Sequence, residues 1–539
     1  MKKTAIAIAT GFSVLMMCQT AFALDHDVVI LHTNDVHCGI DEKIGYRGLV
    51  SYKEEMKEET PYVSLVDAGD SIQGAPVGTL SEGEAMIQLM NQAGYDFAIP
   101  GNHEFDYGMK RFLDLSWQLD CGYYSCNFVN LPSMENVLKP YKIIDYDDIK
   151  IAYVGVTTPE SITKSTPKYF QDNLERYRYG FCEDKTGEAL YERVQKTVDE
   201  AKKQGADYVI LVGHLGNEGV TPYWRSKSVI EHTTGIDAVI DGHSHEAGVE
   251  EVTNQEGKTV VLTQTGTKFQ NIGKLTITTD GKVKADLVDS VEIHDNNEAV
   301  KAISDKIERI ESQYEESLKT VLAHTDVDLT DSDPATGNRA VRNQETNLGD
   351  FCADAMRYTT GADIGIMNGG GIRAGIKAGD ITYGDALNVY PYGNMICVAE
   401  ATGQQIKDAL EMGAKNYPEE SGGFIQVSGM RYTIDSSIPS SVVIDEKRNF
   451  VGVSGEYRVR DIYVGDEPLD LNKTYTVATH NYWLKAGGDG MKMLKETTLL
   501  KDEFMVDVDT ITKYVSEYLN GSVGNEYAEL RGQGRITIK

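Results

Sequence analysis

Five short segments in the first half of the chain carry aspartate, asparagine and histidine side chains that could bind metal ions. Glycine precedes the polar residues in four of them, which lets the backbone and an ion approach closely. Carboxylate, amide and imidazole groups suit divalent ions such as Mn²⁺, Zn²⁺, Co²⁺ or Fe²⁺. Only Cys38 adjoins a segment, so a site of several thiolates is not expected. The segments are Asp35-Val36-His37, Gly69-Asp70, Gly101-Asn102-His103-Glu104, Gly213-His214 and Gly242-His243-Ser244-His245.

Each segment taken alone has an ordinary explanation. An Asp-x-His pair is often a helix cap or a surface pair, and a lone Asn102 or His214 is typical of a structural polar group. All five nevertheless lie in one half of the chain, and each follows an apolar, strand-like run. This combination favours a shared metal centre.

The apolar runs before these segments predict the elements that position them. Such runs are typical of strands buried on both faces, as in parallel sheets. Polar residues at the ends of such strands are typical of α/β active sites, where loops carry the chemistry on a rigid sheet. We therefore predict an α/β fold for the first half. The main runs are Val28–Leu31, Tyr62–Val66, Ile151–Val156, Val209–Val212 and Ala238–Ile240.

The pattern changes near residue 297, where apolar residues recur every three or four positions. This spacing predicts one amphipathic helix. Because 539 residues exceed one ordinary core, we expect two domains, at 24–296 and 325–539, with a connecting helix at 297–324. A helix at 347–358 and a strand at 474–478 predict a mixed α/β second domain. The apolar positions of the connecting helix are Val300, Ile303, Ile307, Ile310, Tyr314 and Leu318.

The N-terminus has the pattern of a secretory signal peptide. Lys2 and Lys3 precede an apolar stretch, and Ala21-Phe22-Ala23 has the small-x-small pattern of a cleavage site. Cleavage after Ala23 is favoured over lipid attachment at Cys18, because Met17 is bulky for a lipidation motif. No later stretch is apolar for long enough to span a bilayer. We therefore expect residues 1–23 to be removed and the protein to be exported, to the periplasm or the cell surface.

The formal net charge of −31 excludes wrapping of a nucleic-acid polymer and disfavours binding to an anionic membrane. An anionic substrate would need a locally positive site made by metal ions or arginines. The chain has seven cysteines, of which six remain without the signal peptide, and their spacing does not require disulfides. Oligomeric state is left open.

In their order, the five segments resemble the calcineurin-like metallophosphoesterase superfamily, with its D-x-H, G-D, G-N-H-E, G-H and G-H-x-H blocks. The resemblance implies a β-sandwich flanked by helices and two divalent ions, of uncertain identity among Mn, Zn, Co and Fe. Two ions about 3.5–4 Å apart can clamp the attacking and leaving oxygens and turn water into the nucleophile at neutral pH. The implied ligands are Asp35, His37, Asp70 and His245 for one ion, and Asp70, Asn102, His214 and His243 for the other, with His103 as a catalytic group oriented by Asp106.

The second half carries arginine, aromatic and acidic residues that suit a nucleotide. Guanidinium groups bind phosphate in a bidentate fork. Aromatic faces stack on a base for about 1–3 kcal/mol, and an aspartate can accept from ribose hydroxyls. The ordinary alternatives are salt-bridged surface arginines and aromatic residues that pack in a core. The residues concerned are Arg339, Arg342, Arg373, Tyr392, Trp483 and Asp489.

These residues fall in T-N-x-G, N-G-G-G-I-R, P-F/Y-G-N and G-G-D-G motifs, which resemble the C-terminal domain of secreted 5′-nucleotidases and UDP-sugar hydrolases. The resemblance implies that Tyr392 and Trp483 sandwich the base and that Asp489 binds ribose. Arg339 lies one position from an arginine found in relatives, and Trp483 stands where phenylalanine is common. The other implied contacts are Arg342 and Arg373 with the phosphate, and Asn394 and Gly422 with the base.

We therefore predict an exported enzyme that removes the 5′-phosphate from nucleotides at a site between two domains, with a second domain that swings to admit substrate. Hydrolysis of UDP-sugars, of 2′,3′-cyclic nucleotides or of 3′-nucleotides remains an alternative, because relatives share these motifs. A thiol hydrolase of sulfur oxidation would have no use for the nucleoside motifs. A nucleotide-binding surface protein without turnover is the alternative outside enzymes.

Overall fold

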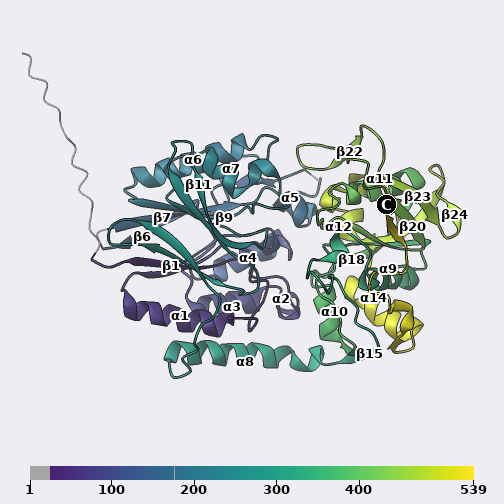
Figure 1. Ribbon diagram of the computed structural model, residues 1–539, viewed down its shortest axis with the longest axis horizontal. Coiled ribbons are helices and arrows are strands. Elements are labelled where there is room, and N and C mark those ends of the chain that lie inside the picture. Colours follow the sequence, from purple (N-terminus) through teal and green to yellow (C-terminus); the bar gives the residue numbers. More distant parts are fainter. Residues whose placement is uncertain (1–24, 148, 175) are drawn as a thin grey trace, which may run out of the picture.

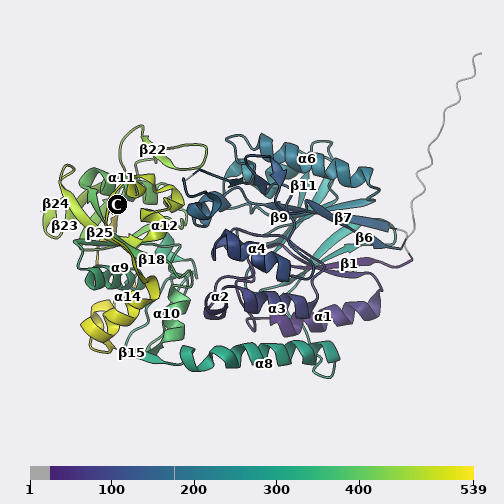
Figure 2. The ribbon, with the colours of Figure 1, turned by 180° about the vertical axis from the view of Figure 1, so that it is seen from behind.

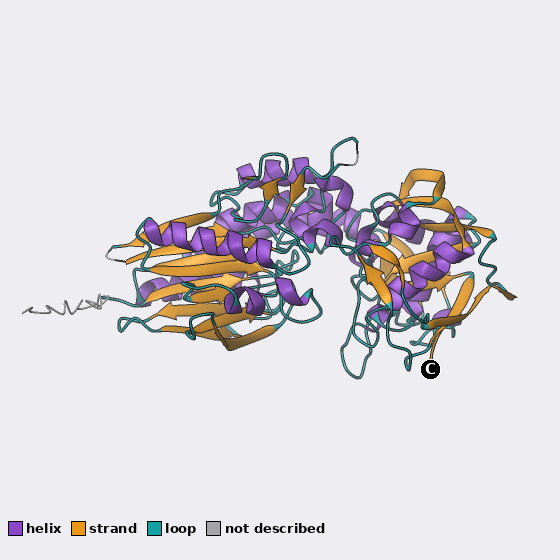
Figure 3. Cartoon of the chain, turned by 90° about the horizontal axis from the view of Figure 1, so that it is seen from above, coloured by secondary structure: helices purple, strands orange, loops and turns teal. Residues whose placement is uncertain are grey.

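The computed structural model describes residues 25–147, 149–174 and 176–539, which form two lobes joined along one edge by the long helix α8 (Glu298–Leu318) (Figure 1). Figures 2 and 3 show the same two lobes from behind and from above. The predicted signal peptide and its cleavage site lie outside the described residues. Within the described chain, no helix is both long and apolar enough to cross a membrane.

The first lobe contains two sheets, and each predicted apolar run is a strand in one of them. The first sheet has the order β14 (Val283–Val288), β13 (Ile272–Ile277), β1 (Val28–Thr33), β2 (Val63–Asp67) and β3 (Phe97–Ala98). The second has the order β11 (Ala247–Thr253), β12 (Thr259–Thr265), β10 (Ala238–Ile240), β9 (Tyr208–His214), β7 (Ile149–Thr157) and β6 (Tyr141–Tyr146). In the first sheet, β1, β2 and β3 run parallel. In the second, β7, β9, β10 and β12 run parallel.

The alternation of side chains along each strand explains why the two sheets pack face to face. Val28 and Ile30 of β1 belong to the same buried cluster as Tyr153 of β7, between the sheets. Val29 and Leu31 point to the opposite face, as alternate residues of a strand must, and are buried under helices. The predicted sandwich flanked by helices is therefore confirmed. The flanking helices include α1 (Gly45–Glu59) and α3 (Glu84–Ala93) on the first sheet, and α6 (Glu188–Lys203) and α7 (Ser226–Glu231) on the second.

Helix α8 begins after Asn297, whose side chain accepts hydrogen bonds from the backbone N–H groups of Ala299 and Val300. This cap satisfies N–H groups that the first turn of a helix leaves unpaired. The predicted apolar positions from Val300 to Ile310 are buried in the first-lobe core, whereas Leu318 packs against the core of the second lobe. One helix is thus anchored in both lobes.

The second lobe is built around a mixed five-stranded sheet, which agrees with the predicted mixed α/β domain. The predicted helix is α9 (Asn347–Thr360), and the predicted strand is β25 (Thr474–His480). Helices α10 (Tyr383–Val389), α11 (Gly403–Ala414), α12 (Asn481–Leu484) and α14 (Asp507–Lys513) complete the part of the lobe that positions the site. The sheet has the order β19 (Ile425–Ser428), β16 (Ile364–Asn368), β25, β18 (Met395–Thr402) and β26 (Thr498–Val506).

Candidate active site

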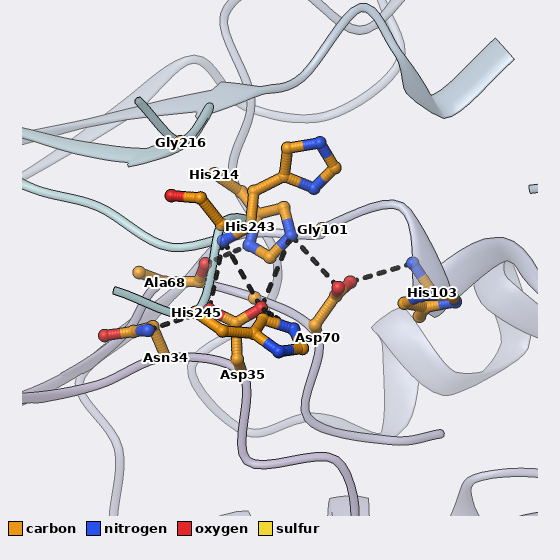
Figure 4. A network of polar contacts seen from close by, with 12 residues as sticks. Asn34, Asp35, Ala68, Asp70, Gly101, His103, His214, Gly216, His243 and His245 are labelled. Atoms are coloured by element: carbon orange, nitrogen blue, oxygen red, sulfur yellow. Dashed lines mark hydrogen bonds and ion pairs between the residues drawn. The ribbon is translucent and has the colours of Figure 1, made fainter. Parts of the chain in front are cut away.

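The parallel strands of the first lobe bring the five predicted segments together. The carboxyl ends of parallel strands lie at the same edge of a sheet, and four of the segments follow β1, β2, β3 and β10. His214 is the last residue of β9. Residues as far apart as Asp35 and His245 therefore lie in one network of polar contacts (Figure 4).

The side chains form two neighbouring clusters, within each of which the ligand atoms lie within 4.8 Å of one another. In the first, His245 Nε2 lies 3.3 Å from Asp35 Oδ1 and 3.1 Å from His37 Nε2. In the second, Asp70 and His243 accompany His214, whose Nε2 lies 3.1 Å from Asp70 Oδ2. The same Asp70 oxygen is 3.9 Å from His37 Nε2, so it lies between the clusters.

In two of the cluster histidines, one ring nitrogen has a backbone hydrogen-bond partner outside the clusters. Nδ1 of His37 lies 2.9 Å from the carbonyl oxygen of Gln73, and Nδ1 of His214 lies 2.7 Å from that of Ala68. Because a carbonyl only accepts, each Nδ1 carries a proton, so each Nε2 presents a lone pair to its cluster when the ring is neutral. This is the arrangement that a metal-binding histidine requires.

Asn102 supplies an independent test of the fit to cations. Its Oδ1 is buried and has no hydrogen-bond partner in the described part of the chain. An unpaired buried amide oxygen is unfavourable unless a ligand satisfies it. Asn102 also lines the same cavity as Asp70. The oxygen and nitrogen donors therefore fit two divalent cations of the hard-to-borderline type.

The backbone at the clusters is held in an unusual conformation. Five predicted ligands have positive φ angles, which non-glycine residues rarely adopt and which concentrate at functional sites. Gly101 is needed for close approach, because a Cβ atom there would lie 2.2 Å from Asp70 Oδ1 and 2.7 Å from His214 Nε2. The ligands with positive φ are Asp35, His37, Asp70, His243 and His245.

Glu104 holds two of the ligand loops together. Its Oε2 accepts from the backbone N–H groups of Asp70 (2.8 Å) and Gly101 (2.6 Å), and its Oε1 accepts from that of Ser71 (2.8 Å). The side chain is fully buried. Its role is thus to fix the backbone that presents Asp70.

Replacing Glu104 with glutamine should place an amide NH₂ against backbone N–H donors. We expect Glu104→Gln to lower the free energy of unfolding by about 1–3 kcal/mol, the usual penalty for an unsatisfied buried group. Urea denaturation should measure this loss, and a lower metal content should accompany it. Glu84→Gln is the matched control, because Glu84 is 47% exposed and pairs with Arg111 at 3.2 Å. Equal stability of the two variants would contradict the role of Glu104.

His103 lies beside the clusters, where its backbone N–H donates to Asp70 Oδ1 at 2.8 Å. Its Nδ1 lies 2.6 Å from Asp106 Oδ2, and Asp106 in turn accepts from Ser165 Oγ at 2.8 Å. Burial lowers the pKa of His103, because it disfavours the charged imidazolium. The combined electrostatic effects of Tyr392, Asp106 and Asp70 are larger and raise the pKa of His103 to about 10. Cations bound at the clusters would oppose this charge.

A cavity of about 380 Å³ lies against the clusters and is lined by both lobes. Its size falls in the range of small-molecule sites. His103 stacks on Tyr392 of the second lobe, with ring centroids 5.5 Å apart, and Arg373 lies 5.7 Å from the Tyr392 ring centroid. A more open hollow of about 660 Å³ near Lys407 and Tyr457 contains none of the predicted residues. The predicted substrate residues in the first cavity are Arg342, Arg373, Tyr392, Asn394, Gly422 and Asp489.

The arginines make the second-lobe wall of this cavity positive. Burial and the neighbouring Arg373 lower the pKa of Arg342 to about 10, and Arg342 Nε has no partner in the described part of the chain. Cations crowded in this way are stabilised by a bound anion. Arg339 does not line the cavity, because its guanidinium donates to the carbonyl of Ile372 and lies 3.7 Å from Asp331.

Trp483 does not occupy the position that the base sandwich requires. Its side chain is fully buried in the second-lobe core, and its Nε1 lies 3.4 Å from Asp489 Oδ2. The neighbouring Tyr482, which the sequence did not single out, lines the cavity and donates from its hydroxyl to the carbonyl of Thr163 in the first lobe (2.6 Å). Consecutive side chains of helix α12 point in different directions, so only one of the two aromatics faces the cavity.

Three cationic residues that were not predicted from the sequence also line the cavity, namely Lys164, Lys415 and Arg448. Lys164 lies 3.7 Å from Asp489 Oδ1. Burial, together with repulsion from Lys164 and Arg448, lowers the pKa of Lys415 to about 8. No motif marked these residues, since isolated basic residues are common on protein surfaces. None of the six cysteines in the described chain forms a disulfide bond.

Comparison with known families agrees with this geometry. Residues 28–247 match the calcineurin-like phosphoesterase family, and residues 321–496 match the 5′-nucleotidase C-terminal domain. The first match includes both metal clusters, and the second includes the arginines, Tyr392 and Asp489. The chain belongs to the family that joins these two domains, and it is a metal-dependent phosphoester hydrolase.

Individual relatives support this assignment. The chain is 30% identical over 558 residues to the trifunctional nucleotide phosphoesterase protein YfkN of Bacillus subtilis. The aligned region covers 95% of this chain but only 35% of YfkN, which is the longer protein. It is 27% identical to a 5′-nucleotidase of Diplobatis ommata, over 96% of this chain and 92% of the relative. The crystal structure of a 5′-nucleotidase precursor from Thermus thermophilus superposes with a TM-score of 0.76 at 26% identity, covering 95% of this chain and 99% of that one.

Proposed function

We propose that this protein is an exported 5′-nucleotidase that hydrolyses nucleoside 5′-monophosphates to nucleoside and phosphate. The observation that carries the proposal is one cavity that has members of both clusters on one wall and Arg342, Arg373, Tyr392 and Asp489 on the other. This combination suits a molecule with a phosphate at one end and a nucleoside at the other.

In this proposal, two divalent cations, when bound, supply activation of water and neutralisation of phosphate charge. Arg342 and Arg373 bind the phosphate and orient it toward the clusters. His103, held by Asp106, faces the phosphate and either stabilises its oxygens or protonates the leaving ribose oxygen. Tyr392 and Tyr482 flank the base, and Asp489 accepts from the ribose hydroxyls. Holding these groups in fixed positions removes the entropic cost of assembling them.

Phosphate release from AMP, UDP-glucose and 2′,3′-cyclic AMP, measured side by side on the purified protein, tests the substrate. We expect AMP to have the highest kcat/KM with added Mn²⁺ or Co²⁺, and a chelator to abolish the activity. A preference for the cyclic nucleotide or for the UDP-sugar would replace the proposed substrate. Nucleotide binding without turnover at saturating metal would replace the enzyme by a binding protein.

The arginines give a test of the phosphate end. Arg373→Met or Arg342→Met should each raise KM for AMP by about 10–100-fold, because charged hydrogen bonds contribute about 1.5–3 kcal/mol. Arg339→Met is the matched control and should change KM by less than about 3-fold, since Arg339 lies outside the cavity lining. Equal effects at Arg339 and Arg373 would contradict this assignment.

Export is supported by the signal-like N-terminus and by the description of the Thermus thermophilus relative as a precursor. Fractionation of cells that express the full chain, with N-terminal sequencing of the mature protein, tests it. Retention of residues 1–23 in the cytoplasm would contradict export.

A further inference from the structure

A hairpin of the second lobe reaches across to the first lobe beside the cavity. It consists of β21 (Val442–Ile444) and β22 (Phe450–Val453), whose connecting turn carries Lys447 and Arg448 (Figure 1). Lys447 forms an ion pair with Glu183 and lies 4.6 Å from the ring centroid of Tyr177. Both contacts join the hairpin to the first lobe.

Arg448 connects the hairpin to a buried carboxylate. Its Nη1 donates to Thr221 Oγ1 and lies 3.9 Å from Glu160 Oε1. The Glu160 side chain is only 3% exposed, and its Oε1 accepts from both the backbone N–H (3.0 Å) and the hydroxyl of Thr221. Arg448 therefore faces the same oxygen that Thr221 binds.

The other oxygen of Glu160 faces a predicted metal ligand. Glu160 Oε2 lies 3.1 Å from His243 Nε2. A carboxylate accepts from this nitrogen, which fixes the ring so that the lone pair of His243 Nδ1 is left for the cluster with Asp70 and His214. Partners of this kind orient metal-binding histidines and strengthen their binding.

We propose that Arg448, Thr221 and Glu160 form a relay that positions His243, so that docking of the hairpin and metal binding at the second cluster reinforce each other. The proposal rests on the metal centre of the proposed function, but it does not depend on the substrate. Glu160 and Arg448 are positioning residues, because they act through His243. The relay crosses the boundary between the lobes, so one lobe influences a ligand that the other holds.

The physical basis of the coupling is thermodynamic linkage. If the docked hairpin favours the ring orientation of His243 that binds metal, metal binding must favour the docked hairpin by the same factor. The backbone at His243, with the preceding glycine and the positive φ angle of His243, does not fix the orientation of the imidazole ring. The orientation therefore depends on Glu160, whose own position depends on Thr221 and Arg448.

Titration of the metal-free protein with Mn²⁺, without nucleotide, tests the relay. We expect Glu160→Gln to weaken one of the two sites by about 10–100-fold and to leave the other unchanged. Arg448→Met should weaken the same site by at least about 5-fold, the lower range of allosteric coupling. Glu446→Gln is the matched control, because Glu446 lies on the same turn, is 71% exposed and meets only Lys185 at 4.0 Å among the ion pairs of the described chain.

Hydrogen exchange of residues 442–453 measures the reciprocal effect. Mn²⁺ should increase protection of the hairpin in the wild-type protein and in Glu446→Gln, but not in Glu160→Gln. The proposal would be overturned if Arg448→Met bound Mn²⁺ with wild-type affinity at both sites. It would also be overturned if Mn²⁺ did not change the hydrogen-exchange protection of the hairpin in the wild-type protein. If Glu160→Gln does not fold, Arg448→Met decides alone, since Arg448 lies at the lobe boundary. Failure to hydrolyse AMP would affect neither measurement, so failure of the proposed substrate can be distinguished from failure of the relay.

Discussion

Asp70→Asn should lower phosphate release from AMP by more than about 10³-fold, which corresponds to several kcal/mol of lost charge stabilisation. Asp70 Oδ2 lies 3.1 Å from His214 Nε2 and 3.9 Å from His37 Nε2, so it is within reach of both clusters. Asparagine can keep the hydrogen bond from the His103 N–H but turns an NH₂ toward the cations. Metal analysis after dialysis against defined Mn²⁺ should find fewer than two ions per chain.

Asp96→Asn provides the control for this prediction. Asp96 also accepts a backbone N–H, that of Leu65 at 2.9 Å, but belongs to neither cluster. We expect it to keep two ions and near-normal turnover. Two tightly bound ions with undiminished hydrolysis in Asp70→Asn would contradict a bridging carboxylate and the metal centre built on it.

His103→Ala should lower kcat for AMP by about 10²–10⁴-fold, the usual contribution of a general acid or base. The side chain lies outside both metal clusters, so metal content should remain at the wild-type level. Asp106→Asn should give a smaller loss, because it removes the charge that orients the ring at 2.6 Å but leaves the ring in place. Steady-state kinetics together with metal analysis separate these effects.

The leaving group distinguishes the two possible roles of His103. If His103 protonates the leaving oxygen, His103→Ala should slow p-nitrophenyl phosphate much less than AMP, since nitrophenolate leaves without a proton. If His103 stabilises the phosphate oxygens, both substrates should slow equally. His232→Ala is the control, because His232 packs on Tyr191 and belongs to neither metal cluster. Unchanged kcat for both substrates in His103→Ala would remove this residue from catalysis.

Much of the candidate site could be predicted from residue patterns in the sequence. The apolar runs predicted strands because residues buried on both faces must be apolar, and the polar residues after them marked the edge where parallel strands end. The grouping of the ligands into two sets followed from resemblance, and the structure brings those sets together as two clusters with Asp70 between them.

The orientation of individual side chains was not predictable in the same way. Trp483 and Tyr482 are adjacent aromatics, and the motif pointed to Trp483, yet Tyr482 faces the cavity. Trp483 is buried in a core cluster that includes Met491 and Leu494. Which of two neighbours on a short helix turns inward is decided by the packing of such a core, which the motif alone does not specify. Arg339 is a similar case, because Asp331 and the Ile372 carbonyl hold it outside the cavity.

The sequence by itself determined the strand runs, the ligand types at their ends and the two-part organisation, because burial and metal preference depend on residue type and local order. Only the tertiary structure decided that Glu160 meets His243 and that Arg448 reaches both Thr221 and Glu160 from the other lobe. These contacts join residues far apart in the chain. Their spacing carries no local signal, since it is set by the packing of whole lobes.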